Sequence, residues 1–221
     1  LTRRVAAMRL PPAALLGLVV ALAAALSAVF TNDIVCLAMA PLAMAQRSRV
    51  DTKITSLKFE SERTPSFKDS SRGSQGSRET WCRIDLAFDT KGARNGWLDE
   101  VEVFWMILAE SDVSSKPLVM TQSVFYTDVE DGKHAACIYL KPKFFKRYIG
   151  SSRIDSRKLS VYVEIRVDGQ RVAREEIKSN RVPDGWYNKA EAAGRIIQSE
   201  LLPKSKTPFA PLDYDYYEHE K

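Results

Sequence analysis

The sequence predicts a mainly β fold, an antiparallel sandwich of about seven strands with a short helical corner and a C-terminal helix and tail. Two observations lead to this prediction. Apolar and polar residues alternate with a period of two through most of the chain after residue 50, as in strands with one buried face. These runs follow one another through turns, without the strand–helix alternation of a parallel sheet, which favours a sandwich.

The clearest strands occupy the middle of the chain. In WCRIDLAFDT, apolar residues from Cys82 to Phe88 fall on every second position and so share one face. In WLDEVEVFWMILAE both faces are apolar beyond Glu102, which predicts a central strand. Further strands are predicted in TKITSLKFE, PLVMTQSVFYTDV, HAACIYLKP, LSVYVEIRV and RVAREEI. Because Ile54 and Leu57 are out of period in the first of these, we expect a bulge there.

Turn signals separate the predicted strands. Asn95-Gly96 marks a turn, and hairpins are expected at Glu130-Asp131-Gly132 and at Asp168-Gly169. KPKFFKRYIG, after the fifth strand, predicts a short helix, and the polar SERTPSFKDSSRGSQGSRE predicts a loop. The sandwich core is therefore expected over residues 81–178, preceded by the first strand and the polar loop over 46–80.

Residues 179–221 are expected to form a helix and a tyrosine-rich tail. Asn188 and Glu191 stand in a capping-box pattern before AEAAGRIIQSELL, and Pro203 would end that helix. The final KTPFAPLDYDYYEHEK is either a strap over the body or a segment offered to a partner. Its candidate contact residues are Phe209, Tyr214, Tyr216 and Tyr217.

The N-terminus has the pattern of an export signal. Three arginines precede an apolar run over residues 13–30, and small-x-small sites follow at Ala40 and Ala45. Residues 1–45 are therefore predicted to be a signal peptide, cut at one of these sites, or else a retained anchor. Both alternatives export the remaining chain to the periplasm, the outer membrane or the cell surface.

The cysteines and histidines favour a structural protein over an enzyme. Removal of the signal leaves Cys82 and Cys137, which in an oxidising compartment would form a disulfide or remain two buried thiols. The only histidines are His134 and His219, and no zinc, nucleophile or phosphate-loop motif is present. We therefore expect no catalytic residue, no metal site, no cofactor and no small-molecule substrate.

The most basic segment is KPKFFKRYIGSSRIDSRK, in a chain with a formal charge of +5. Basic side chains interleaved with aromatics can hold polyanions. The candidate contacts are Lys141, Lys143, Lys146, Arg147 and Arg153. The alternative is a helical corner whose aromatics plug the sandwich while its cations are solvated.

The spacing of Cys82, Trp105 and Cys137 resembles that of an immunoglobulin-type sandwich. The tryptophan stands farther from the first cysteine than in antibody domains, and Ala135 occupies the position of their corner tyrosine. Together with the export signal, the segments WCRIDLAFDT, WLDEVEVFWMILAE, KPKFFKRY and TPFAPLDYDYY resemble a family of exported Akkermansia-type verrucomicrobial proteins encoded with type IV pilus genes.

The resemblance implies an immunoglobulin-like, non-enzymatic module that acts by protein–protein contact in a pilus-associated envelope or surface assembly, or in adhesion. Its partners would be envelope or pilus proteins, or further copies of the same chain as a homo-oligomer. The alternative function is a polyanion-binding module for DNA, lipopolysaccharide or sulfated glycans, which would use residues 141–158.

Overall fold

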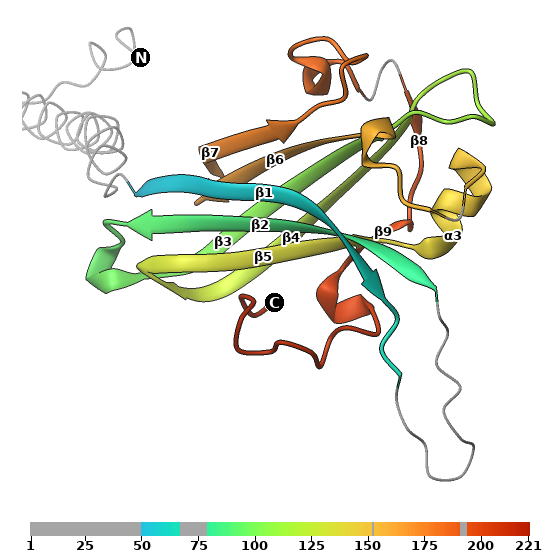
Figure 1. Cartoon of the computed structure of the whole chain (residues 1–221). Helices are drawn as coiled ribbons and strands as arrows, with labels where there is room; N and C mark the ends of the chain where they lie inside the picture. Colours follow the sequence, from blue (N-terminus) through green and yellow to red (C-terminus); the bar gives the residue numbers. More distant parts are fainter. Residues whose placement is uncertain (1–49, 67–78, 152, 191–193) are drawn as a thin grey trace, which may run out of the picture. The chain divides into compact units, whose positions relative to one another are not determined.

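The computed structural model describes residues 50–66, 79–151, 153–190 and 194–221 (Figure 1). Its strands are β1 (Asp51–Arg63), β2 (Thr80–Lys91), β3 (Trp97–Ala109), β4 (Leu118–Glu130), β5 (Gly132–Leu140), β6 (Leu159–Val167), β7 (Gln170–Ile177), β8 (Arg195–Ile196) and β9 (Leu201–Pro203). One sheet has the order β1-β2-β5-β9 and the other the order β7-β6-β3-β4-β8. Only the pairing of β4 with β8 is parallel among these neighbours, so the predicted antiparallel sandwich is confirmed.

The short helical elements lie between strands or after them. They are η1 (Arg94–Gly96), α3 (Pro142–Phe144), η2 (Phe145–Ile149), η3 (Ser156–Lys158), η4 (Trp186–Asn188) and η5 (Lys204–Lys206). The elements α3 and η2 occupy the expected helical corner after β5. Among the described residues, no helix is both long enough and apolar enough to cross a membrane. The expected signal peptide, residues 1–45, and the centre of the polar loop lie outside the described residues.

The core lies between the two sheets. Every second residue of β2 from Cys82 to Phe88 is buried, in one cluster with Trp105 and Ile107 of β3. The predicted alternation and the predicted central place of β3, between β4 and β6, are therefore confirmed. Each fully buried large apolar side chain of this kind contributes about 1.5–3 kcal/mol.

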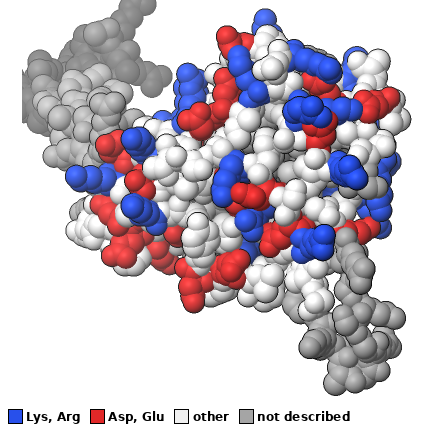
Figure 2. Space-filling view, viewed as in Figure 1, with Lys and Arg blue, Asp and Glu red and all other residues white. Residues whose placement is uncertain are grey.

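The two ends of the sandwich are built differently. At the turn end, residues 92–96, 131 and 168–169 connect strands, and β1 begins there. At the loop end, the connections run through residues 110–117, 141–158 and 178–190. The turn end lies at the left of Figure 1, and acidic side chains gather over its lower part in Figure 2.

The predicted hairpin at Asp168-Gly169 and the predicted bulge in the first strand are both present. Asp168 and Gly169 both have positive φ, at 52° and 72°, as in the type I′ turn of a tight hairpin, and they join the paired strands β6 and β7. The register between β1 and β2 shifts between Ile54 and Ser56, which confirms the predicted bulge.

The hairpin expected at residues 130–132 is wrong. β4 pairs with β3 and β8, whereas β5 pairs with β2 and β9, so Asp131 carries the chain from one sheet to the other. The Asp131 N–H donates to the Gly96 carbonyl at 2.8 Å, and its carboxylate accepts from the N–H groups of Gly92 and Ala93 at 2.9 and 3.2 Å. These bonds tie the connection between β4 and β5 to the neighbouring β2–β3 turn. The strands β4 and β5 do not pair with each other.

The helix expected over residues 190–202 is wrong in its described part after residue 193. The Gly194 N–H donates to the Ala190 carbonyl at 2.8 Å, as in one helical turn, but the chain then forms β8 against β4 and β9 against β5. A Cβ on Gly194 would lie 2.4 Å from Cγ2 of Val119, so the backbone runs directly against β4. A helix this short is marginal alone, and pairing with open strand edges outweighs its propensity.

Candidate functional site

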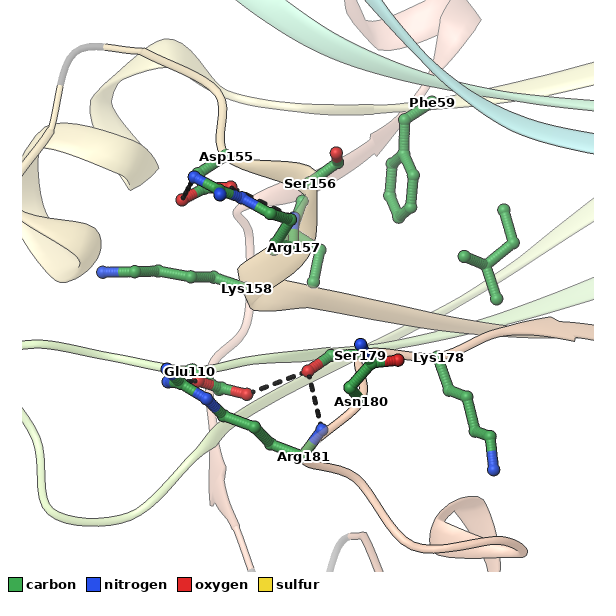
Figure 3. A pocket seen from close by; sticks show the side chains of 12 residues that line it. Phe59, Glu110, Asp155, Ser156, Arg157, Lys158, Lys178, Ser179, Asn180 and Arg181 are labelled. Atoms are coloured by element: carbon green, nitrogen blue, oxygen red, sulfur yellow. Dashed lines mark hydrogen bonds and ion pairs between the residues drawn. The ribbon is translucent and has the colours of Figure 1, made fainter.

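A cleft of about 520 Å³ opens at the loop end of the sandwich. Its floor is apolar and comes from three strands: Phe59 of β1, Leu159 of β6 and Ile177 of β7. Residues 155–158 form one rim and residues 178–181 the other. Phe59 projects toward the space between these rims (Figure 3). The period-two pattern of the strands explains the floor, because each of these residues is an inward position of its strand, and Leu159 begins β6 while Ile177 ends β7.

The first rim is held by a capped turn. The Asp155 carboxylate accepts from the Arg157 backbone N–H at 3.2 Å and from its Nε at 3.0 Å. The hydrogen bond from the Arg157 side chain lowers the pKa of Asp155 below its usual value. Lys158 also lines the cleft, and its Nζ pairs with Asp112 at 2.6 Å. The turn therefore presents two cations in defined positions.

The second rim is held by a buried serine. The Ser179 N–H donates to Oγ of Ser160 at 3.0 Å, and Oγ of Ser179 donates to Oε1 of Glu110 at 3.1 Å. Arg181 reaches the same carboxylate, with 2.8 Å between Nη1 and Oε2. Lys178 pairs with Asp184 beside the cleft. Glu110 thus anchors the rim to the end of β3 from a position about seventy residues away in sequence.

The cleft combines exposed cations with an apolar floor. Arg157 and Arg181 have side chains that are 89% and 79% exposed, so their ion pairs are of the weak kind that can exchange for a ligand's acids. An apolar floor between cationic rims fits an apolar or aromatic side chain that has acidic neighbours. No group of three or more metal-ligating side chains occurs in the part of the chain that the structure describes.

The disulfide expected between Cys82 and Cys137 is wrong, because both are free thiols. Cys82 pairs with Leu140 across β2 and β5, which places Cys137 three positions away along β5. An odd offset puts the two side chains on opposite faces of the sheet. Cys82 lies in the cluster between the sheets, whereas Cys137 packs with Tyr139 under the C-terminal segment. The alternative of two buried thiols is the one that the structure contains.

Both thiols are poor nucleophiles. Burial raises the pKa of Cys82 to about 12 and raises that of Cys137 well above its ordinary value. Since the thiolate is the reactive form, neither cysteine is set up for covalent catalysis at neutral pH.

The candidate polyanion contacts lie at the corner formed by α3 and η2. Lys143, Lys146, Arg147 and Arg153 are exposed, and Lys141 donates to the Ser199 carbonyl. The interleaved aromatics Phe144, Phe145 and Tyr148 are buried. Lys146 pairs with Glu79 at 3.7 Å, and the Arg147 guanidinium lies 4.9 Å from the Tyr148 ring centre. This arrangement is that of a solvated corner whose aromatics plug the sandwich.

The C-terminal strap, residues 204–221, lies on the outer face of the sheet that contains β5. Phe209 is buried and stacks on Tyr139 with 4.8 Å between ring centres, and the Tyr217 hydroxyl donates to Asp85 at 3.1 Å. Tyr214 and Tyr216, in contrast, are 61% and 67% exposed. Two of the four candidate tail residues therefore anchor the strap, and two face outward.

Sequence reasoning missed a hydrogen-bonded chain that fastens the strap. Nε2 of His134 lies 2.9 Å from Oγ1 of Thr90, and its Nδ1 lies 2.7 Å from Oε1 of Glu218. The order threonine, histidine, carboxylate matches that of catalytic triads, but Thr90 is buried and its hydroxyl donates to the Glu130 carbonyl at 3.2 Å. These hydrogen bonds are structural, and the three residues that they join lie too far apart in sequence for a motif to reveal them.

The cleft residues were also missed as a site. Arg157 and Lys158 stood out only as part of a basic segment, and Glu110, Ser179 and Arg181 carried no signal, because folding alone brings them together. The period-two pattern that includes Phe59 and Ile177 predicts burial and not a cleft.

Comparisons with known proteins agree with the fold. A protein-family model matches residues 43–221, which is most of the chain. A crystal structure of a protein from Akkermansia muciniphila matches with a TM-score of 0.69 and 20% identity, over 79% of this chain and 95% of that chain. At this identity the structural match shows the shared fold alone. None of the curated proteins compared matches the chain.

Proposed function

The chain belongs to the family whose model matches residues 43–221, and on that premise we propose that it is an exported, non-enzymatic module that acts by protein–protein contact. Its setting would be an envelope or surface assembly associated with type IV pili, or adhesion. The arginines and the apolar run before residue 31 support export. The resemblance of its segments to exported proteins encoded with pilus genes supports the setting.

The cleft is the observation that favours contact with a protein. Its floor offers apolar area, and its rims offer exposed cations that are positioned by hydrogen bonds formed before any partner arrives. Preformed side-chain positions reduce the entropy that binding costs. Arginines beside apolar area are also the residues that dominate the binding energy of many interfaces.

The state of the reactive side chains supports a role other than catalysis. The thiols of Cys82 and Cys137 are buried and of raised pKa, and His134 is held between Thr90 and Glu218. The binding of polyanions gains no comparable support, since the cations of the corner are spread around buried aromatics and partly paired with acids.

Site-specific photocrosslinking in envelope preparations tests the proposal. A photoreactive amino acid at the rim residue Asn180 should give a reproducible protein adduct, identified by mass spectrometry. The double variant Arg157→Glu, Lys178→Glu should reduce that adduct strongly, and the probe placed at Lys206 of the strap is the matched control. Equal adducts from positions 180 and 206, or no effect of the double variant, would contradict a contact at the cleft.

A further inference from the structure

The two ends of the sandwich differ in their balance of exposed charge. At the turn end the exposed acids are Asp51, Asp99, Glu100, Asp128, Glu130 and Asp168, and they stand among the exposed cations Lys53, Lys91, Lys133, Arg171 and Lys221, the last of which pairs with Glu100. Exposed cations gather at the loop end, where they are Lys116, Lys143, Lys146, Arg147, Arg153, Arg157, Lys178 and Arg181. At the loop end they outnumber the exposed acids of the described residues, Asp112 and Asp184. A difference in charge balance along the strand direction favours contact between unlike ends.

The turn end also presents an exposed tryptophan. Trp97, the first residue of β3, is 50% exposed. The residues before it, Asn95 and Gly96, have positive φ, and the Gly96 carbonyl accepts from the Asp131 N–H at 2.8 Å. Glu130 lies opposite Trp97 in the β3–β4 ladder. The indole therefore extends from a fixed backbone beside an acid, so little conformational entropy opposes its use in binding.

The cleft has the complementary chemistry. A tryptophan needs apolar area for the body of its ring, which Phe59 and Ile177 provide. Guanidinium groups such as those of Arg157 and Arg181 interact favourably with an indole face and with carboxylates next to it. Tryptophan and arginine are also the residues most enriched among strong interface contacts.

We propose that Trp97 of one copy enters the loop-end cleft of a second copy, so that the chains associate head to tail. The inference deepens the proposed function, since it names the partner of the cleft. Because indole and cleft lie at opposite ends of one sandwich, each bound copy leaves an unoccupied tryptophan and an unoccupied cleft, and the contact can repeat into rows or close into rings.

The charges favour this arrangement over a symmetric dimer. A two-fold contact through the loop ends would bring cationic surfaces together, and one through the turn ends would leave both clefts unoccupied. Only the unlike pairing of ends places the carboxylates near Trp97 against the arginines of the cleft.

Sedimentation velocity on residues 46–221 provides the first test, since Arg49–Lys221 form one compact unit with its own core. The wild-type protein should associate as its concentration rises, and less so in about 0.5 M salt. Trp97→Ala, or Glu130→Lys as a second variant, should raise the dissociation constant, the former by about 30-fold. Arg157→Glu with Lys178→Glu should do the same from the other side. Tyr216→Ala and Lys206→Glu are exposed controls that should leave association unchanged.

Mixing the variants makes the test specific. Trp97→Ala retains the cleft, and the double cleft variant retains Trp97, so each should be monomeric alone while an equimolar mixture forms a one-to-one pair and nothing larger. A mixture that stays monomeric, or a wild-type protein that stays monomeric at all concentrations, would overturn the inference. If crosslinking at Asn180 then still captures a different envelope protein, the proposed function survives without self-association.

Discussion

The turn end and the loop end of this sandwich obtain their structure in different ways. At the turn end the connections are short, and residues in the left-handed region, such as Asn95 and Asp168, set the path of the chain. At the loop end, the rims depend on hydrogen bonds between distant segments, such as those from Ser179 and Arg181 to Glu110. Local backbone chemistry shapes one end, and tertiary contacts shape the other.

This difference has a functional consequence. An end built from tight turns can present a side chain such as Trp97 rigidly, but it offers little concave surface. An end built from longer segments can leave a cleft, because side chains from three strands meet there without filling the space. Surfaces of unlike shape therefore arise at the two ends.

The largest effect is expected from Gly194→Ala at the loop end. The added Cβ would lie 2.4 Å from Cγ2 of Val119 and 3.0 Å from the Ala190 carbonyl oxygen, so β8 must shift away from β4. We expect a loss of about 1–3 kcal/mol in the free energy of unfolding. Urea denaturation measures it, and an unchanged midpoint would mean that the segment after residue 190 does not pack on β4.

A somewhat smaller loss is expected from Asp131→Ala at the turn end. The carboxylate accepts from the backbone N–H groups of Gly92 and Ala93, and its removal leaves those donors to solvent. The loss should be about 1–2 kcal/mol. The neighbouring exposed Glu130→Ala is the matched control and should be close to neutral. Equal free energies of unfolding for the two variants would show that the Asp131 carboxylate does not stabilise the link between the β4–β5 connection and the β2–β3 turn.

Gly169→Ala separates strain from packing. Gly169 has φ of 72° and no heavy atom within 4 Å of an added Cβ, so only backbone strain opposes the change. We expect a loss of about 1 kcal/mol. Thermal denaturation beside Gly194→Ala should show the turn-end glycine variant to be the more stable of the two, and the reverse order would contradict the comparison of the two ends.

The same contrast explains what the sequence could predict. Alternation in WCRIDLAFDT and the Asp168-Gly169 signal are local, and they identified strands and a hairpin that the structure contains. The connection at Asp131 was misjudged because its turn signal does not reveal that the strands on either side join different sheets. The C-terminal helix was misjudged because the open edges of β4 and β5, which pair with that segment, are tertiary features.

The candidate site was the least predictable part. Cys82 and Cys137 invited a disulfide by number and compartment, but only the register of β2 and β5 shows that they face opposite ways. The cleft needs Glu110 and Ser179 to meet, and no spacing in the sequence links them. Residues that contribute through distant contacts leave no periodic signal.

The smallest effect on stability, and the most specific readout, is expected from Arg157→Ala in the first rim. The arginine is largely exposed, so its removal should leave the unfolding midpoint unchanged within error. The pKa of Asp155 should rise, because the hydrogen bond from the Arg157 side chain is the main cause of its lowered value. A lowered carboxyl pKa stabilises the fold above the unfolded-state pKa, and this contribution is lost as the pH falls through the folded-state pKa. The variant should therefore be less sensitive to pH in that acid range.

Carbon-detected NMR titration of the Asp155 carboxyl measures this change directly. Lys158→Ala is the matched control, since Lys158 lowers the same pKa more weakly than Arg157 does, and its removal should shift the titration less. An unchanged titration in Arg157→Ala would show that the capped turn does not hold the guanidinium in place. The rim would then lack the fixed cation on which the proposed contact at the loop end depends, whereas the rigid presentation of Trp97 at the turn end would be unaffected.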